Sequence, residues 1–112
     1  EVRPFLTPGL IDMTGAKESP DVELFGPILQ VYRKASFEEA MAEANNTPYG
    51  LSAGVWTDKG SRILWMAGQL RAGVVWANTF NRFDPTSPFG GYKESGYGRE
   101  GGRHGLEAYL DV

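Results

Sequence analysis

The clearest structural signal in the chain is the run Ser36-Phe37-Glu38-Glu39-Ala40-Met41-Ala42-Glu43-Ala44. Ser36 and Glu39 form a capping box, because the Ser36 hydroxyl can accept a hydrogen bond from the Glu39 N–H while the Glu39 carboxylate reaches back to the helix start. One stripe of apolar side chains recurs with helical spacing, at Phe37, Ala40, Met41 and Ala44. The turn residues Asn45-Asn46-Thr47-Pro48 follow, so we expect the helix to end there.

Segments rich in β-forming residues flank this helix. Before it, residues 27–33 are apolar up to Arg33 except for Gln30, which is typical of a strand buried on both faces. After it, residues 49–56 and 74–78 each predict a strand. Between these two strands we expect a second helix from Lys59 to about Arg71, capped by Asp58. Its predicted buried stripe consists of Ile63, Met66, Ala67 and Leu70.

The order of these elements predicts the fold class. A short strand is expected at residues 10–13, and a last helix at 99–110, weakened by three glycines that each cost about 1 kcal/mol relative to alanine. Strand, helix, strand, helix, strand in succession indicates an α/β fold, a mostly parallel sheet with helices packed on it. Right-handed crossovers would put both helices on one face of that sheet.

Size and charge limit the classes of function. The chain has 112 residues with 41% apolar and 22% charged residues, which suits one globular domain. A net charge of −3 provides no basic surface for nucleic acid or an anionic membrane, and no apolar run is long enough for a membrane span. The absence of cysteine excludes disulfides and thiolate metal sites and fits a cytoplasmic chain. Both ends look cut, so we expect a piece of a longer polypeptide.

A glycine-rich loop is the main candidate for function. It contains the run Ser87-Pro88-Phe89-Gly90-Gly91-Tyr92-Lys93-Glu94-Ser95-Gly96-Tyr97-Gly98-Arg99-Glu100. Glycine at this density lets the backbone approach a ligand closely. Phe80, Phe83 and Phe89 would form an apolar pocket wall around it, and loops of this length are often functional. The alternative is that these aromatic side chains only anchor the loop.

Other motifs carry less information on their own. Residues 96–101 match G-x-G-x-x-G, but no strand precedes them, so the match does not predict a dinucleotide site. Glu23 and Glu100, taken alone, are best interpreted as solvated carboxylates. His104 is the single histidine, which supports neither a metal site nor a catalytic triad.

Four motifs resemble the C-terminal part of the NAD(P)-dependent aldehyde dehydrogenases, in the order and at the spacing of that family. They are Glu23-Leu24-Phe25-Gly26-Pro27, Ala44-Asn45-Asn46-Thr47-Pro48-Tyr49-Gly50-Leu51, Ala72-Gly73-Val74-Val75-Trp76-Ala77-Asn78 and Pro88-Phe89-Gly90-Gly91-Tyr92-Lys93-Glu94-Ser95-Gly96. The resemblance implies that residues 1–112 are the C-terminal half of an aldehyde dehydrogenase-like catalytic domain. In the family, the Rossmann half and the cysteine nucleophile precede this segment, and a dimerising strand follows it.

The resemblance implies oxidation of an aldehyde to a carboxylic acid with NAD or NADP as the hydride acceptor, in a homo-oligomer. It also implies roles for individual residues. The position of Glu23 holds the nicotinamide ribose, and those of Phe25 and Leu51 pack near the nicotinamide ring. Phe89 matches an aromatic residue in the substrate tunnel, and Phe80 and Phe83 lie in the specificity loop of that tunnel, so all three are expected to bind substrate. Glu100 matches a glutamate that relays protons behind the nucleophile.

The resemblance leaves the substrate and the choice between NAD and NADP open. Residues 7–15 resemble succinylglutamate-semialdehyde dehydrogenases, whereas residues 78–102 resemble general or betaine-aldehyde-type enzymes. Without a cysteine, the isolated chain is expected to be inactive. The alternative function is a non-catalytic interaction module that pairs with a full-length enzyme subunit.

Overall fold

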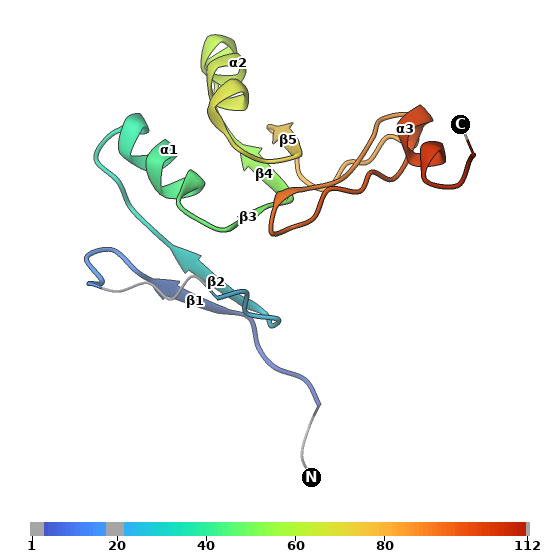
Figure 1. The fold of residues 1–112 in the computed structure, drawn as a ribbon. Helices are drawn as coiled ribbons and strands as arrows, with labels where there is room; N and C mark the ends of the chain where they lie inside the picture. Colours follow the sequence, from blue (N-terminus) through green and yellow to red (C-terminus); the bar gives the residue numbers. More distant parts are fainter. Residues whose placement is uncertain (1–3, 18–21, 112) are drawn as a thin grey trace. The chain divides into compact units, whose positions relative to one another are not determined.

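The computed structural model describes residues 4–17 and 22–111, and the chain divides into two units, residues 1–40 and 41–112. The first unit contains strands β1 (Gly9–Asp12) and β2 (Ile28–Val31), which pair in parallel (Figure 1). Both strands were predicted. The expectation that residues 27–33 are buried on both faces is wrong for this unit, because Ile28 and Leu29 are exposed. Nothing in the described part of the unit forms a layer over them.

Helix α1 (Phe37–Asn45) begins and ends as the sequence predicts. The Ser36 Oγ accepts a hydrogen bond from the Glu39 N–H at 3.1 Å. The Glu39 carboxylate accepts one from the Ala35 N–H at 3.0 Å, one residue earlier than in the usual reciprocal cap. The helix start is therefore held by bonds among residues close in sequence.

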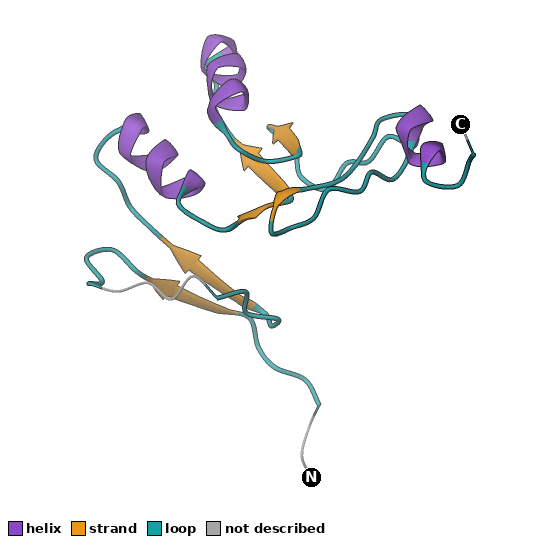
Figure 2. Ribbon diagram, viewed as in Figure 1, coloured by secondary structure: helices purple, strands orange, loops and turns teal. Residues whose placement is uncertain are grey.

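The second unit contains two further strand pairs (Figure 2). Strands β4 (Ser52–Val55) and β5 (Val74–Ala77) are parallel, whereas β3 (Tyr49–Gly50) and β6 (Tyr92–Lys93) are antiparallel. The predicted single strand at 49–56 is thus two strands with different partners. The α/β class with mostly parallel pairing is confirmed, although the strands form three two-stranded sheets.

Helix α2 (Gly60–Gln69) connects β4 to β5, and its predicted stripe is half-buried. The prediction that Asp58 caps it is wrong. Lys59 occupies the N-cap position without a side-chain hydrogen bond, and its N–H donates to the Thr57 hydroxyl at 3.2 Å. The buried side chains of the described core are Met41, Val55 and Trp76, with exposed fractions of 6%, 2% and 7%.

Helix α3 (Gly102–Glu107) is shorter than the predicted 99–110. Gly101 and Gly102 have φ of 71° and 57°, a left-handed conformation that glycine adopts without steric cost and that does not continue a right-handed helix toward residue 99. The helix therefore starts at the second of these glycines, with Gly101 as its N-cap residue. Among the residues that the structure describes, no helix has the length and apolarity that crossing a membrane would require.

Candidate functional site

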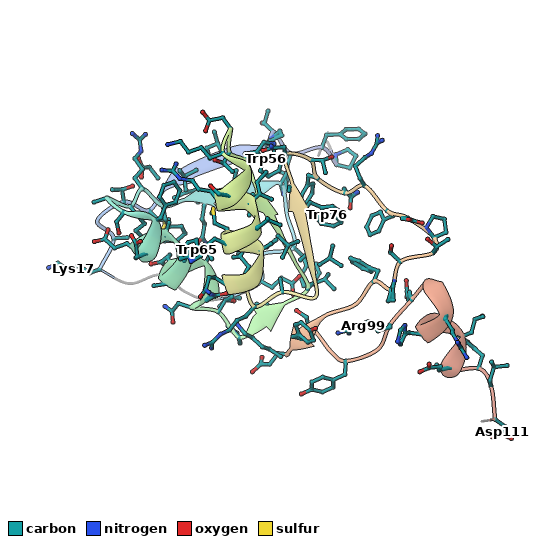
Figure 3. The ribbon with its side chains drawn as sticks, turned by 90° about the horizontal axis from the view of Figure 1, so that it is seen from above. Lys17, Trp56, Trp65, Trp76, Arg99 and Asp111 are labelled. Atoms are coloured by element: carbon teal, nitrogen blue, oxygen red, sulfur yellow. The ribbon has the colours of Figure 1, made fainter. Side chains whose placement is uncertain are left out.

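An aromatic cluster forms around Trp76 in the second unit. The Trp76 ring lies 5.1 Å from that of Phe80, 5.5 Å from Phe83 and 6.5 Å from Phe89, and Phe83 and Phe89 are 4.9 Å apart. Figure 3 shows Trp76 on the side of β5 that faces the long loop. The three phenylalanines predicted to form a wall therefore lie together. Sequence reasoning missed Trp76 as their centre, although a tryptophan in the strand that enters the loop was an available signal.

Hydrogen bonds hold the first part of this loop. The Trp76 indole N–H donates to the Arg82 carbonyl at 3.0 Å. The Asn78 side chain pairs with the backbone of Thr57 through two bonds, 2.8 Å to its N–H and 3.0 Å to its carbonyl. Asn78 and Asn81 have φ of 52° and 56°, values that asparagine tolerates better than most residues. The cluster is thus supported by polar bonds at the backbone as well as by ring contacts.

The Asp84 side chain closes the turn that follows. Its carboxylate accepts the Thr86 N–H at 2.8 Å and the Thr86 hydroxyl at 2.7 Å. These bonds favour the ionised form, first the one from the backbone N–H and then the one from the hydroxyl, and they lower the pKa of Asp84 below its ordinary value. Asp84 therefore fixes the loop more strongly when it is ionised than when it is protonated.

Glu100 is tied to the aromatic cluster through its backbone. It forms an isolated antiparallel bridge with Phe89, and its side chain is exposed. Inside the loop that this bridge closes, the Arg99 guanidinium donates to three carbonyls and lies 5.0 Å from the Tyr92 ring. The predicted proton relay and one predicted wall residue thus belong to one hydrogen-bonded segment.

Two backbone segments, at Gly73 and Gly90, approach each other closely at the start of β5. A Cβ atom at Gly73 would overlap the carbonyl oxygen of Gly90, so only glycine fits there without movement of the loop. The Gly73 N–H also donates to the Gly50 carbonyl at 3.0 Å. Leu51, a predicted cofactor contact, follows Gly50 directly, and its carbonyl accepts the Val74 N–H at 3.3 Å.

The other predicted cofactor contacts lie in the first unit. Glu23 is exposed, and Phe25 is 93% exposed at the edge of a hollow of about 540 Å³. The hollow is lined mainly by apolar residues: Leu6, Thr7, Gly9, Leu24, Phe25, Gly26, Pro27 and Ile28. An apolar hollow with an aromatic side chain in its lining suits a ligand with a flat ring, and Glu23 precedes this lining segment in the sequence.

No cluster of three or more His, Cys, Asp or Glu side chains suited to a metal ion occurs within residues 4–17 and 22–111. His104 lies on α3 and is exposed.

Comparison with known proteins defines the class. The chain matches the aldehyde dehydrogenase family over residues 4–112. It is 46% identical over 100 residues to the mitochondrial aldehyde dehydrogenase of Homo sapiens, an alignment that covers 89% of this chain and 19% of that protein. The aldehyde dehydrogenase of Enchytraeus buchholzi is 45% identical over 101 residues, covering 90% and 20%.

Solved structures agree with this result. PnpE from Pseudomonas sp. WBC-3 superposes with a TM-score of 0.84 at 42% identity, covering 91% of this chain and 21% of that one. An indole-3-acetaldehyde dehydrogenase in complex with NAD+ gives a TM-score of 0.77 at 47% identity, covering 80% and 18%. The chain belongs to the aldehyde dehydrogenase family. It spans about a fifth of the length of the curated relatives it matches.

Proposed function

We propose that this chain is the C-terminal half of the catalytic domain of an NAD(P)-dependent aldehyde dehydrogenase, whose whole chain oxidises an aldehyde to a carboxylic acid. The observation that carries the proposal is the family match over residues 4–112. The aromatic cluster around Trp76 supports it, because an apolar wall of this kind suits the carbon chain of an aldehyde.

In this proposal the first unit contributes to the cofactor site. The exposed carboxylate of Glu23 accepts hydrogen bonds from the ribose hydroxyls, and Phe25 packs on the nicotinamide in the adjacent hollow. Leu51 of the second unit contributes a further apolar contact. The donor and acceptor chemistry fits such a ligand, since a carboxylate accepts from paired hydroxyls and an aromatic ring stacks on a flat heterocycle. NAD or NADP, when bound, supplies the acceptor for the hydride.

The second unit contributes the substrate wall and a proton path. Phe80, Phe83 and Phe89 exclude water from the aldehyde carbon chain, and the exclusion of water suppresses side reactions of the bound substrate. Glu100 holds or passes a proton from its position beside Phe89. The 112 residues contain no cysteine, so the thiolate that attacks the carbonyl must come from elsewhere in the protein.

The test is a comparison of two proteins. The full-length protein that carries this segment should reduce NAD or NADP when supplied with a panel of aldehydes. The purified 112-residue chain should not, because no covalent thioester can form without a thiol. Turnover by the isolated chain would contradict the proposal that the attacking thiolate lies outside these 112 residues. Absence of turnover by the full-length protein with every aldehyde would contradict the activity itself.

We further propose that the protein is a homo-oligomer and that the isolated chain self-associates. Large apolar side chains are exposed on it, among them Phe25, Leu64 and Tyr109. Exposed apolar surface and unpaired strand edges promote association. Light scattering over a dilution series checks this for the isolated chain. A stable monomer at about tens of micromolar, where such surfaces usually associate, would contradict the proposal.

A further inference from the structure

Lys93 has an unusual backbone conformation, and its side chain forms two hydrogen bonds to a distant part of the chain. Its φ is 55°, in the left-handed region that lysine rarely occupies. Its ammonium group donates to the carbonyls of Asn45 at 3.2 Å and Thr47 at 2.9 Å. A residue held in a costly conformation by its surroundings is a reason to look for a role at that position.

The two carbonyls belong to the end of α1 and the turn that follows. No basic residue lies in the last turn of α1, so its negative C-terminal end has no cation of its own. Lys93 supplies that cation from β6, far along the chain, and donates to the Asn45 carbonyl at the helix end and to the Thr47 carbonyl in the turn. The bond is thus tertiary, and it joins α1 to the glycine-rich loop.

Asn45 extends this connection to α2. Its side-chain amide donates to the Gln69 carbonyl at 2.9 Å, and its side-chain oxygen accepts the Arg71 N–H at 2.8 Å. The ends of α1 and α2 are therefore locked together at the residue whose carbonyl Lys93 binds.

The segment between Asn45 and Leu51 is fastened to the same loop along its length. The Pro48 carbonyl accepts the Glu94 N–H at 3.0 Å. Tyr49 pairs with Lys93 in the β3–β6 ladder. The Gly50 N–H donates to the Ser95 hydroxyl at 3.0 Å. Leu51 is the next residue after this stretch, and its carbonyl accepts the Val74 N–H, so the loop and the start of β5 together determine where Leu51 lies.

We propose that Lys93 is a positioning residue for the cofactor: its ammonium group holds the 45–51 segment so that Leu51 meets the nicotinamide. This inference rests on the proposed function. It assigns to Lys93 an effect on cofactor binding that acts through Leu51, without direct contact between Lys93 and the cofactor.

The experiment uses the full-length enzyme with Lys93→Met, Lys93→Gly and Lys93→Arg. Calorimetry gives the Kd of the oxidised cofactor, and steady-state kinetics give separate KM values for cofactor and aldehyde. In the Met and Gly variants, Kd and KM for the cofactor should rise about tenfold, because the charge-assisted bonds are lost. The KM for the aldehyde should stay within about twofold of wild type. Lys93→Arg should keep the cofactor Kd within about threefold, since it retains a cation and donors.

Lys59→Met is the matched control, because Lys59 is an exposed lysine at the N-cap of α2 whose side chain forms no capping hydrogen bond. Lys93→Gly decides the matter if Lys93→Met does not fold, since glycine adopts the positive φ without cost. Wild-type cofactor affinity in Lys93→Gly, or an equal rise in both KM values, would overturn the proposal. A wild-type enzyme that binds neither NAD nor NADP would overturn the proposed function together with this inference.

Discussion

Phe89 and Glu100 exchange two backbone hydrogen bonds, each 2.7 Å long. The bridge closes the glycine-rich loop at its base, and the Arg99 guanidinium fills the loop by donating to the carbonyls of Gly91, Tyr97 and Gly98. These bonds therefore hold the backbone of Phe89, a residue of the proposed substrate wall, next to that of Glu100, the proposed proton relay. A shift of the wall at Phe89 would carry Glu100 with it.

Trp76→Phe should weaken aldehyde binding in the full-length enzyme. The change removes the indole donor to the Arg82 carbonyl, a bond that contributes about 1 kcal/mol. The loop that carries Phe80 and Phe83 would then be less ordered, and the KM for the aldehyde should rise severalfold while that for the cofactor stays unchanged. Steady-state kinetics measure both. Trp65→Phe on α2 is the control, and an equal effect there would argue against a specific role for Trp76.

Gly73→Ala should destabilise the protein. The new Cβ would overlap the Gly90 carbonyl oxygen, so strand β5 or the loop must move, at a cost of about 1–3 kcal/mol. Urea unfolding should show a lower midpoint. Gly68→Ala is the matched control, because a Cβ there meets nothing within 4 Å and lies inside α2. That control should raise the stability by up to about 1 kcal/mol, and a loss there as large as at Gly73 would contradict the steric argument.

Acid should loosen the turn at Asp84. Its pKa in the folded protein is lowered by hydrogen bonds from the Thr86 N–H and hydroxyl, so the folded state favours the ionised form. The stabilising contribution is present above the unfolded-state pKa of about 3.8 and is lost as the pH falls through the lower folded pKa. NMR titration of the Asp84 carboxyl group should give a midpoint below the ordinary value. Thr86→Ala removes the hydroxyl donor and keeps the backbone N–H, so the midpoint should move part of the way upward. An unchanged midpoint would rule out the hydroxyl bond as a cause.

Glu23→Gln should weaken cofactor binding in the full-length enzyme. A hydrogen bond from a hydroxyl to a carboxylate contributes roughly 1.5–3 kcal/mol, and the neutral amide retains only part of it. The cofactor affinity should fall about tenfold, and hydride transfer should slow because the nicotinamide is less often in reactive geometry. Calorimetry and single-turnover kinetics measure the two effects. Glu107→Gln on α3 serves as the control, and wild-type values for Glu23→Gln would refute the assignment.

Much of the local structure was predictable because it depends on neighbours in sequence. The strands at β2 and β5 follow from short apolar runs, and the family was recognisable from four spaced motifs. Two predictions were wrong at segments that form backbone hydrogen bonds with residues far away in the sequence. The segment 49–56 is divided at Leu51 because β3 pairs with β6 whereas β4 pairs with β5. The last helix starts late because Glu100 bonds to Phe89 and the next two glycines turn the chain.

The sequence by itself determined α1, because its cap is made by Ser36 and Glu39, which are three residues apart. It also supplied Phe80, Phe83 and Phe89 as candidates for a common wall. Only the tertiary structure decided that Trp76 is their centre and that Lys93 binds the end of α1. Helical periodicity and capping act within a few residues of chain. A bond such as that from Lys93 to Asn45 depends instead on chain segments meeting in space, and no local pattern encodes that meeting.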